Sequence, residues 1–504
     1  MSRFSFLDYL VVISYLVCVL GIGFYFLKRQ KSTDDYFIAS KRIPGWAMGL
    51  GLIATLVSNI TFLAYPGASY GTSWVLFTQN FMLWIVIYPI ALFAVPFYRN
   101  VIGSSLYEFF EKRFGYGVRA YGAFTFILYY ISKLGVIMYV LALAISTMTG
   151  LNCFLLILVL GMITITYTLL GGIEAVTWTD VIQGVLLIGG GLLCLGIALF
   201  KGTEGPGFIF EKAWEAGKFN LGESSFNLKR DTLMVMILYG LSQHAHNYGT
   251  DQTMVQRFLT AKSTKEAVRG VLISGIACVP VWGLFFLIGT VLWGYYTFGN
   301  NILPQEIAND PDQVFPYFIM NELPRGVKGL ILAALFSAAM STISGGLNSI
   351  STVFTTDLFS RICNRNTWKR LRIARMSVII TGIISLLLAI WLVTRTSQVL
   401  VIYFTLLSIF VGGILGLFLL AVFSKKANSK GVTTAIAVTI LVTSWASLTG
   451  NGVIDLGIFN YTLHPFLIGF LSHATIFLVG YIASLFFQDN IENSKVESTP
   501  KVDT

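Results

Sequence analysis

Runs of about 20 mostly apolar residues recur along almost the whole chain, and they constrain its fold more than any other feature. A helix of about 20 residues is long enough to cross the hydrocarbon core of a bilayer. The composition agrees, because 55% of the 504 residues are hydrophobic and only 12% are charged. In lipid, each backbone polar group needs a partner within the protein, which favours helices. The sequence therefore predicts an all-α polytopic membrane protein rather than several soluble domains.

The apolar runs predict thirteen transmembrane helices, and the basic residues between them predict their orientation. With the N-terminus outside, 24 of the 34 Lys and Arg residues fall in or beside inside loops, 9 fall outside, and Lys133 lies within a span. This bias predicts a multi-pass protein of the plasma membrane with a cytoplasmic C-terminus. The net charge of +10 then reflects topology and does not indicate nucleic acid. The predicted spans are 7–27, 45–70, 75–98, 118–149, 153–170, 174–200, 233–258, 269–298, 328–357, 374–394, 399–424, 431–449 and 464–487.

Two of these spans are interrupted by polar residues. In the first, the apolar run continues to Ala54 and is followed by the polar segment TLVSNITF, so residues 54–61 are expected to leave the helical conformation. The second, 233–258, has a polar centre midway, at residues 243–247. Non-helical backbone at membrane depth is tolerated only within protein or beside a water-filled cavity. Both interruptions are therefore candidate binding sites, and the alternative is a polar kink satisfied by neighbouring helices.

Each interrupted span opens a run of five spans, which is the pattern of an inverted five-helix repeat with its binding sites at the midplane. Within the first run, the paired glycines Gly171 and Gly172 predict a tight inside turn. The predicted segments are an extra helix and inside loop (1–44), the first repeat (45–200), an outside loop (201–232), the second repeat (233–424), two further helices (425–487) and a disordered cytoplasmic tail (488–504).

The predicted helix 328–357 is rich in small hydroxyl residues. Ala338, Ser341, Thr342 and Gly345 fall at i, i+3, i+4 and i+7 on one helical face, and Ser344 lies at its edge. Hydroxyls in a membrane helix need helix partners or a bound polar ligand. Hydroxyl and carbonyl oxygens at this spacing suit a hard monovalent cation, and the alternative is close helix packing through small residues.

Charged and imidazole side chains within the spans are further candidates, since such groups are costly in lipid. Lys133 is expected to hold an anionic substrate group, to snorkel, or to pair with Asp180. Asp180 either coordinates a cation together with hydroxyls, forms a salt bridge or serves as a helix-end charge. His244 and His246 point different ways on a helix, so a metal pair is not indicated, and His244 is expected to form a hydrogen-bonding wall of a cavity. We found no nucleophile–base pair, metal-ligand cluster or phosphate-binding glycine loop, so an enzyme is not predicted.

Four segments in this order resemble the sodium/solute symporter family, which carries sugars, sialic acid, amino acids, vitamins and anions. They are residues 52–61, GGIEAVTWTDVIQG at 171–184, DQTMVQRFLTAKS at 251–263 and AAMSTISGGLNS at 338–349, and the resemblance extends over about residues 7–487. It implies a LeuT-like fold and symport by alternating access, with one or two Na+ ions as coupling ions. Carriers of this architecture can work as single chains in the lipid bilayer.

The resemblance also implies two sets of sodium ligands. The first sodium site would use the carbonyls of Ala54, Val57 and Ala338 and the hydroxyls of Ser341 and Thr342. A second sodium site, present in some members, would use Asp180, Ser341, Ser344 and position 345. Gly345 departs from that pattern because it offers no hydroxyl.

The substrate implied by the resemblance is a small polar solute, best matched by an acidic sugar such as sialic acid (N-acetylneuraminate). A cationic side chain at Lys133 would meet the carboxylate of such a sugar. Neutral sugar or polyol symport and small monocarboxylate symport remain open, as does a membrane sensor on a transporter fold, against which the short tail argues. The expected substrate-binding residues are Ser58, Thr61, Asn80 with Gln79 as its register alternative, Lys133, Gln243, His244 and Asn247.

Overall fold

The computed structural model describes residues 4–202, 205–299, 303–361, 367–395, 403 and 412–487. The regular secondary structure within these ranges is helical, apart from two isolated β-bridges. Nine of the described helices are long and apolar enough to cross a membrane, or ten if a bent pair of helices is counted as one span. The predicted all-helical polytopic membrane fold is therefore confirmed.

The described helices are divided between a bundle and the connections of that bundle. In chain order the bundle contains α1 (Phe6–Leu27), α3 (Gly45–Leu56), α4 (Asn59–Gly71), α5 (Thr78–Pro89), α6 (Val95–Val101), α8 (Tyr116–Thr149), α9 (Cys153–Lys201), α11 (Leu233–Thr250), α12 (Gln252–Thr260), α13 (Thr264–Phe298), α16 (Val327–Val353), α17 (Thr367–Val393), α19 (Ile414–Phe423), α20 (Ser429–Gly450) and α21 (Leu467–Phe486). The connections contain α2 (Thr33–Ile38), α7 (Tyr107–Phe114), α10 (Pro206–Glu215), α14 (Gln305–Ala308) and α15 (Pro311–Glu322).

The count of nine to ten spans differs from the predicted thirteen for identifiable reasons. The predicted spans 153–170 and 174–200 are joined in α9, which counts as one helix although its backbone is broken at Gly172. The predicted span 233–258 is divided between α11 and α12, and neither counts as a span by itself. Of the predicted span 399–424, only residue 403 and residues 412–424 belong to the described part of the chain.

Gly172 is the point where α9 turns back, at the predicted inside turn. Its backbone has φ 55° and ψ −157°, a conformation that is essentially restricted to glycine. A Cβ atom at this position would lie 2.8 Å from the ring atom Cδ2 of Tyr36 and 2.9 Å from its carbonyl oxygen. The turn therefore requires glycine both for its dihedral angles and for the close approach of α2.

We expect Gly172→Ala to destabilise the folded protein by at least about 1–3 kcal/mol, the usual cost of such a backbone conformation for a residue with a side chain. The measurement is the Tm of the purified protein in detergent. Gly189→Ala on the same helix is the matched control, because a Cβ atom there meets nothing within 4 Å among the described atoms. Equal Tm values for the two variants would contradict this account of the turn.

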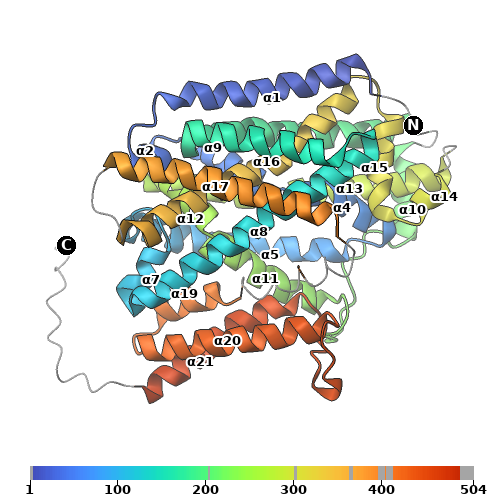
Figure 1. The fold of residues 1–504 in the computed structure, drawn as a ribbon. Coiled ribbons are helices and arrows are strands. Elements are labelled where there is room, and N and C mark those ends of the chain that lie inside the picture. The colour runs from blue at the N-terminus through green and yellow to red at the C-terminus, as the bar shows by residue number, and fades with distance from the viewer. Residues whose placement is uncertain are drawn as a thin grey trace.

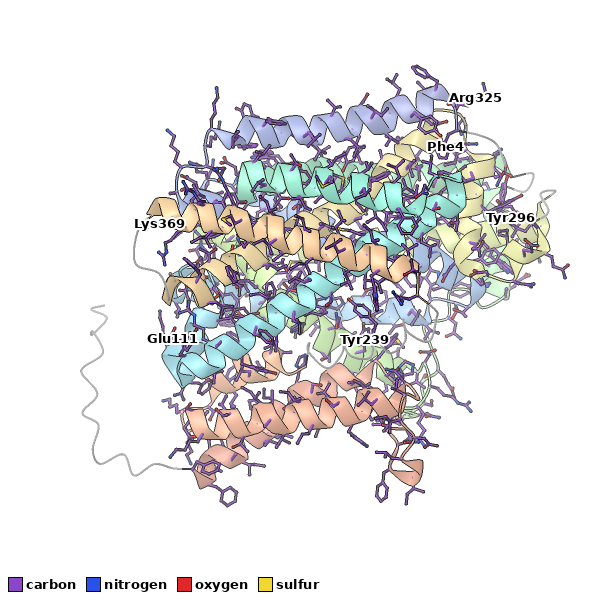
Figure 2. The ribbon with its side chains drawn as sticks, viewed as in Figure 1. Phe4, Glu111, Tyr239, Tyr296, Arg325 and Lys369 are labelled. Atoms are coloured by element: carbon purple, nitrogen blue, oxygen red, sulfur yellow. The ribbon has the colours of Figure 1, made fainter. Side chains whose placement is uncertain are left out.

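The connections fall at two opposite ends of the bundle (Figure 1). The connecting helices α2 and α7 lie at one end, where the bundle helix α12 also lies, and α10, α14 and α15 lie at the other. Figure 2 shows Glu111 and Lys369 at the first end and Tyr296 and Arg325 at the second. The described helices that follow or end three of the predicted spans thus share one end, as the alternation of spans requires.

The hydroxyl-rich helix α16 lies at the centre of the bundle. It packs against α9, α8, α1 and α17, and every residue from Ile331 to Val353 is buried within the protein. Its hydroxyls therefore face other helices rather than lipid.

Candidate functional site

The first interrupted helix breaks between α3 and α4. Helix α3 ends at Leu56, and Val57 (φ −87°, ψ 86°) and Ser58 (φ −84°, ψ 174°) leave the helical conformation. The axes on the two sides of the break differ by 56°. The carbonyls in the last turn of α3 lose their usual helical partners at such a break, and this helix end carries partial negative charge. The break lies within the predicted segment 54–61, whereas Pro66 lies inside α4.

Two hydroxyls of α16 lie directly against this helix end. Ser341 Oγ donates a hydrogen bond of 2.6 Å to the carbonyl oxygen of Ala54. Thr342 Oγ1 lies 3.4 Å from the carbonyl oxygen of Thr55 and 3.3 Å from that of Ala338. Uncharged oxygens from an unwound helix end and from hydroxyls are the donor set that binds Na+ in secondary transporters. The structure thus brings together Ala54, Ala338, Ser341 and Thr342, with Val57 at the break beside them.

A cavity of about 290 Å³ adjoins this contact. Thr55 and Thr342 belong both to its lining and to the contact between α3 and α16. Four of the expected substrate-binding residues line it, namely Ser58, Lys133, Gln243 and Asn247. The rest of the lining was not identified from the sequence and consists of Leu56, Tyr129, Tyr130, Val136, Ile137, Asp251, Thr253 and Met254.

The other four expected substrate-binding residues, Thr61, Gln79, Asn80 and His244, are not among the residues described as lining this cavity. Asn80 and His244 are buried, and the His244 ring stacks on Trp282 with a centroid distance of 5.5 Å. His244 therefore packs against α13, and its expected role as a hydrogen-bonding wall of a cavity stays a prediction.

Lys133 projects into the cavity from α8. Its Nζ atom lies 4.8 Å from the ring centroid of Tyr130 and 5.6 Å from that of Tyr129. Tyr130 donates a hydrogen bond of 2.6 Å to the Asp251 carboxylate at the edge of the same cavity. No carboxylate of the described residues lies within 4.0 Å of the Lys133 ammonium group, so the alternative pairing with Asp180 is not formed.

Asp180 is paired instead with Arg257 of α12. Arg257 Nη2 lies 2.5 Å from Asp180 Oδ2, and the two side chains are 1% and 0% exposed. The salt-bridge alternative for Asp180 is thus confirmed. The sequence pattern does not single out Arg257, which lies at the end of the predicted span 233–258. An acidic side chain within a membrane span needs a buried cation as its partner. This requirement is the signal that could have identified Arg257.

The second interruption lies later than predicted. Residues 243–247 remain helical in α11, which ends at Thr250, and the break is at Asp251 (φ −77°, ψ 120°). The Asp251 side chain accepts a hydrogen bond of 2.8 Å from the Thr253 amide and so caps the N-terminus of α12. The capping residue determines the position of the break, whereas Gln243 and Asn247 remain on the helix and face the cavity.

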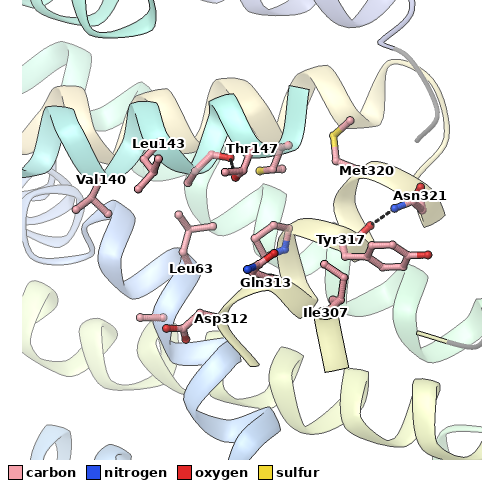
Figure 3. Close-up of a pocket in the computed structure, with 14 residues that line it drawn as sticks. Leu63, Val140, Leu143, Thr147, Ile307, Asp312, Gln313, Tyr317, Met320 and Asn321 are labelled. Atoms are coloured by element: carbon pink, nitrogen blue, oxygen red, sulfur yellow. Dashed lines mark hydrogen bonds between the residues drawn. The ribbon is translucent and has the colours of Figure 1, made fainter. Parts of the chain in front are cut away.

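A second and larger cavity, of about 380 Å³, lies between α4, α8 and the connection helices α14 and α15 (Figure 3). Its lining is mainly apolar and includes Leu63, Val140 and Leu143. Its one acidic residue is Asp312, and its described lining includes neither Lys nor Arg. This lining suits a polar or anionic solute less well than the cavity at Lys133, so we take the latter as the candidate substrate site.

A broken membrane helix whose end meets the hydroxyls of a second helix beside a polar cavity defines a cation-coupled secondary transporter. The chain belongs to the Sodium:solute symporter family, whose family model matches residues 36–438. It is therefore a sodium-coupled solute symporter and a multi-pass membrane protein, not an enzyme.

Individual relatives agree with this assignment. The chain is 31% identical over 502 residues to the sodium/sialic acid symporter NanT of Aliivibrio fischeri, with 98% of this chain and 96% of the relative covered. The solved substrate-bound, outward-open structure of a Na+-coupled sialic acid symporter matches with a TM-score of 0.88 and 32% identity, covering 96% of this chain and 99% of that one. Mhp1, a nucleobase-cation-symport-1 family transporter, matches with a TM-score of 0.56 and 14% identity over 90% of this chain and 94% of its own. The last match bears on the fold alone, and both structures support the LeuT-like fold.

Proposed function

We propose that this symporter imports an acidic sugar such as sialic acid together with sodium, by alternating access across the plasma membrane. The observation that carries the proposal is the Lys133 ammonium group, which faces a polar cavity beside the contact of Ser341 with Ala54. In this proposal the chain crosses the membrane thirteen times, contains two five-helix repeats and has its N-terminus outside. A single chain is the transport unit.

The position of Lys133 favours an anionic substrate. A lysine at the centre of a membrane helix costs about 2.5–3.5 kcal/mol on insertion scales, so it needs a compensating partner. Two tyrosine rings near the ammonium group provide part of that compensation, about 0.5–2 kcal/mol per favourable contact. A substrate carboxylate would complete it, while Ser58, Gln243 and Asn247 offer hydrogen bonds to sugar hydroxyls.

Coupling follows from the residues that the two sites share. Sodium entering from outside would join the end of α3 to α16, and Thr55 and Thr342 would transmit this closure to the cavity wall. The loaded protein would then rock one helix bundle against the other and open the cavity to the inside. One cation moving inward through 100 mV releases about 2.3 kcal/mol, but a monoanionic solute moving with it cancels this contribution, so one sodium ion would drive uptake through its concentration gradient alone.

Uptake into proteoliposomes tests the substrate. Labelled sialic acid is expected to accumulate only with an inward sodium gradient, and excess unlabelled sialic acid should abolish the signal. Glucose, inositol, pyruvate and acetate serve as competitors for the neutral sugar, polyol and monocarboxylate alternatives. Sodium-driven uptake of one of these solutes without uptake of sialic acid would replace the proposed substrate.

A further inference from the structure

The pair of Asp180 and Arg257 connects helix α9 to helix α12. Both side chains are almost completely buried, and their contact is a single one of 2.5 Å. Arginine and carboxylate groups often form two parallel hydrogen bonds. Among the described residues, Asp180 Oδ1 and the Nε and Nη1 atoms of Arg257 have no hydrogen-bond partner. The pair therefore holds a guanidinium group and a carboxylate at a buried position, with part of their hydrogen-bonding capacity unused.

Gly345 of α16 provides the room for this charge. A Cβ atom built on Gly345 would lie 2.9 Å from each of the two Nη atoms of Arg257. Cβ atoms essentially never approach another heavy atom this closely, so a serine or threonine at position 345 would displace the guanidinium group. The guanidinium group thus lies between Asp180 and position 345, which are two members of the second sodium set implied by the family resemblance.

The remaining two members of that set make other hydrogen bonds. Ser341 Oγ donates to the Ala54 carbonyl oxygen at 2.6 Å, on the side of the first sodium set. Ser344 Oγ donates to the Ser341 carbonyl oxygen at 3.2 Å, within its own helix. A sodium ion at this place would meet a carboxylate that is already paired with the Arg257 guanidinium group, and position 345 would offer it no hydroxyl.

We propose that Arg257 is a tethered cation that takes the place of a second sodium ion, so that the protein binds and transports one sodium ion per solute. This inference rests on the sodium symport of the proposed function but not on the identity of the solute. The positive charge of Arg257 stays beside the Asp180 carboxylate after sodium has left. The empty protein can therefore return to its outward-facing form without an unpaired buried carboxylate. For a monoanionic solute, one sodium per cycle makes transport electroneutral.

The number of sodium ions is measured without any solute, by saturation binding of radioactive sodium to the purified protein in detergent. We expect one ion per chain and a Hill coefficient of 1. Two ions per chain would overturn the inference while leaving sodium symport intact. Binding of no sodium would overturn both the inference and the proposed coupling. A failure of sialic acid uptake alone would leave the sodium count, and therefore the inference, unaffected.

Two variants test whether Arg257 is the reason why the chain binds one sodium ion and not two. The double variant Arg257→Gln and Gly345→Ser removes the guanidinium charge and adds a hydroxyl, and it is expected to bind a second sodium ion with a Hill coefficient approaching 2. Arg257→Lys, which keeps a positive charge, is the matched control and is expected to bind one. A folded double variant that still binds one ion would overturn the role of Arg257. If the double variant does not fold, the wild-type count of one or two still decides the inference.

Discussion

Replacing Ser341 by alanine is expected to raise the sodium concentration required for half-maximal uptake by at least about tenfold, which corresponds to about 1.4 kcal/mol of lost binding free energy. The reason is geometric, because Ser341 Oγ lies 2.6 Å from the Ala54 carbonyl oxygen at the end of α3. Alanine removes the hydroxyl oxygen and leaves the carbonyl without this partner. Sodium dependence of uptake in proteoliposomes is the measurement.

The matched control for Ser341→Ala is Ser344→Ala, three residues later in α16. Both serines are buried, and the Ser344 hydroxyl donates to a carbonyl oxygen of its own helix. Ser344→Ala should therefore leave the sodium dependence within about twofold of wild type, since a single helix-internal hydrogen bond contributes only about 0.5–1.5 kcal/mol to folding. An unchanged sodium dependence in Ser341→Ala would mean that the first sodium site is assigned to the wrong residues.

The central contact between α3 and α16 was predictable because both of its partners are local patterns. Helical periodicity alone places Ala338, Ser341 and Thr342 on one face, and a polar segment in an apolar run indicates the break near Val57. The resemblance to the family then paired the two segments. Burial of α16 from Ile331 to Val353 gives these hydroxyls no lipid to face, so the predicted face had to meet a neighbouring helix.

The features that the sequence did not reveal depend on long-range contacts. Asp180 and Arg257 are 77 residues apart, and no local pattern around either residue indicates that the fold buries the two side chains against each other. The sequence predicts the second break at the polar residues 243–247 of α11. The structure has it at Asp251, whose side chain caps the N-terminus of α12. The stacking of His244 on Trp282 of α13 is a further long-range contact that the local pattern does not encode.

The second large effect is expected for Lys133→Met, which should lower kcat/KM for sialic acid uptake by about 30-fold or more. Removing one member of a buried charge pair costs about 2–5 kcal/mol, because the substrate carboxylate would enter the cavity without a cation. Methionine keeps most of the length and apolar volume of the lysine side chain, so the loss reports on the charge. Initial rates of sodium-driven uptake at several substrate concentrations give the measurement.

Lys133→Arg is the matched control, because it keeps the positive charge at this position of α8 while changing its shape. It should retain more sialic acid uptake than Lys133→Met. Sodium binding without solute distinguishes a substrate contact from a structural role: both variants should bind sodium as wild type does, since Lys133 is not among the residues that join α3 to α16. If Lys133→Met lost sodium binding as well, Lys133 would support the fold rather than the substrate. If it kept full uptake of sialic acid, the carboxylate would bind elsewhere, and the cavity would fit a neutral sugar.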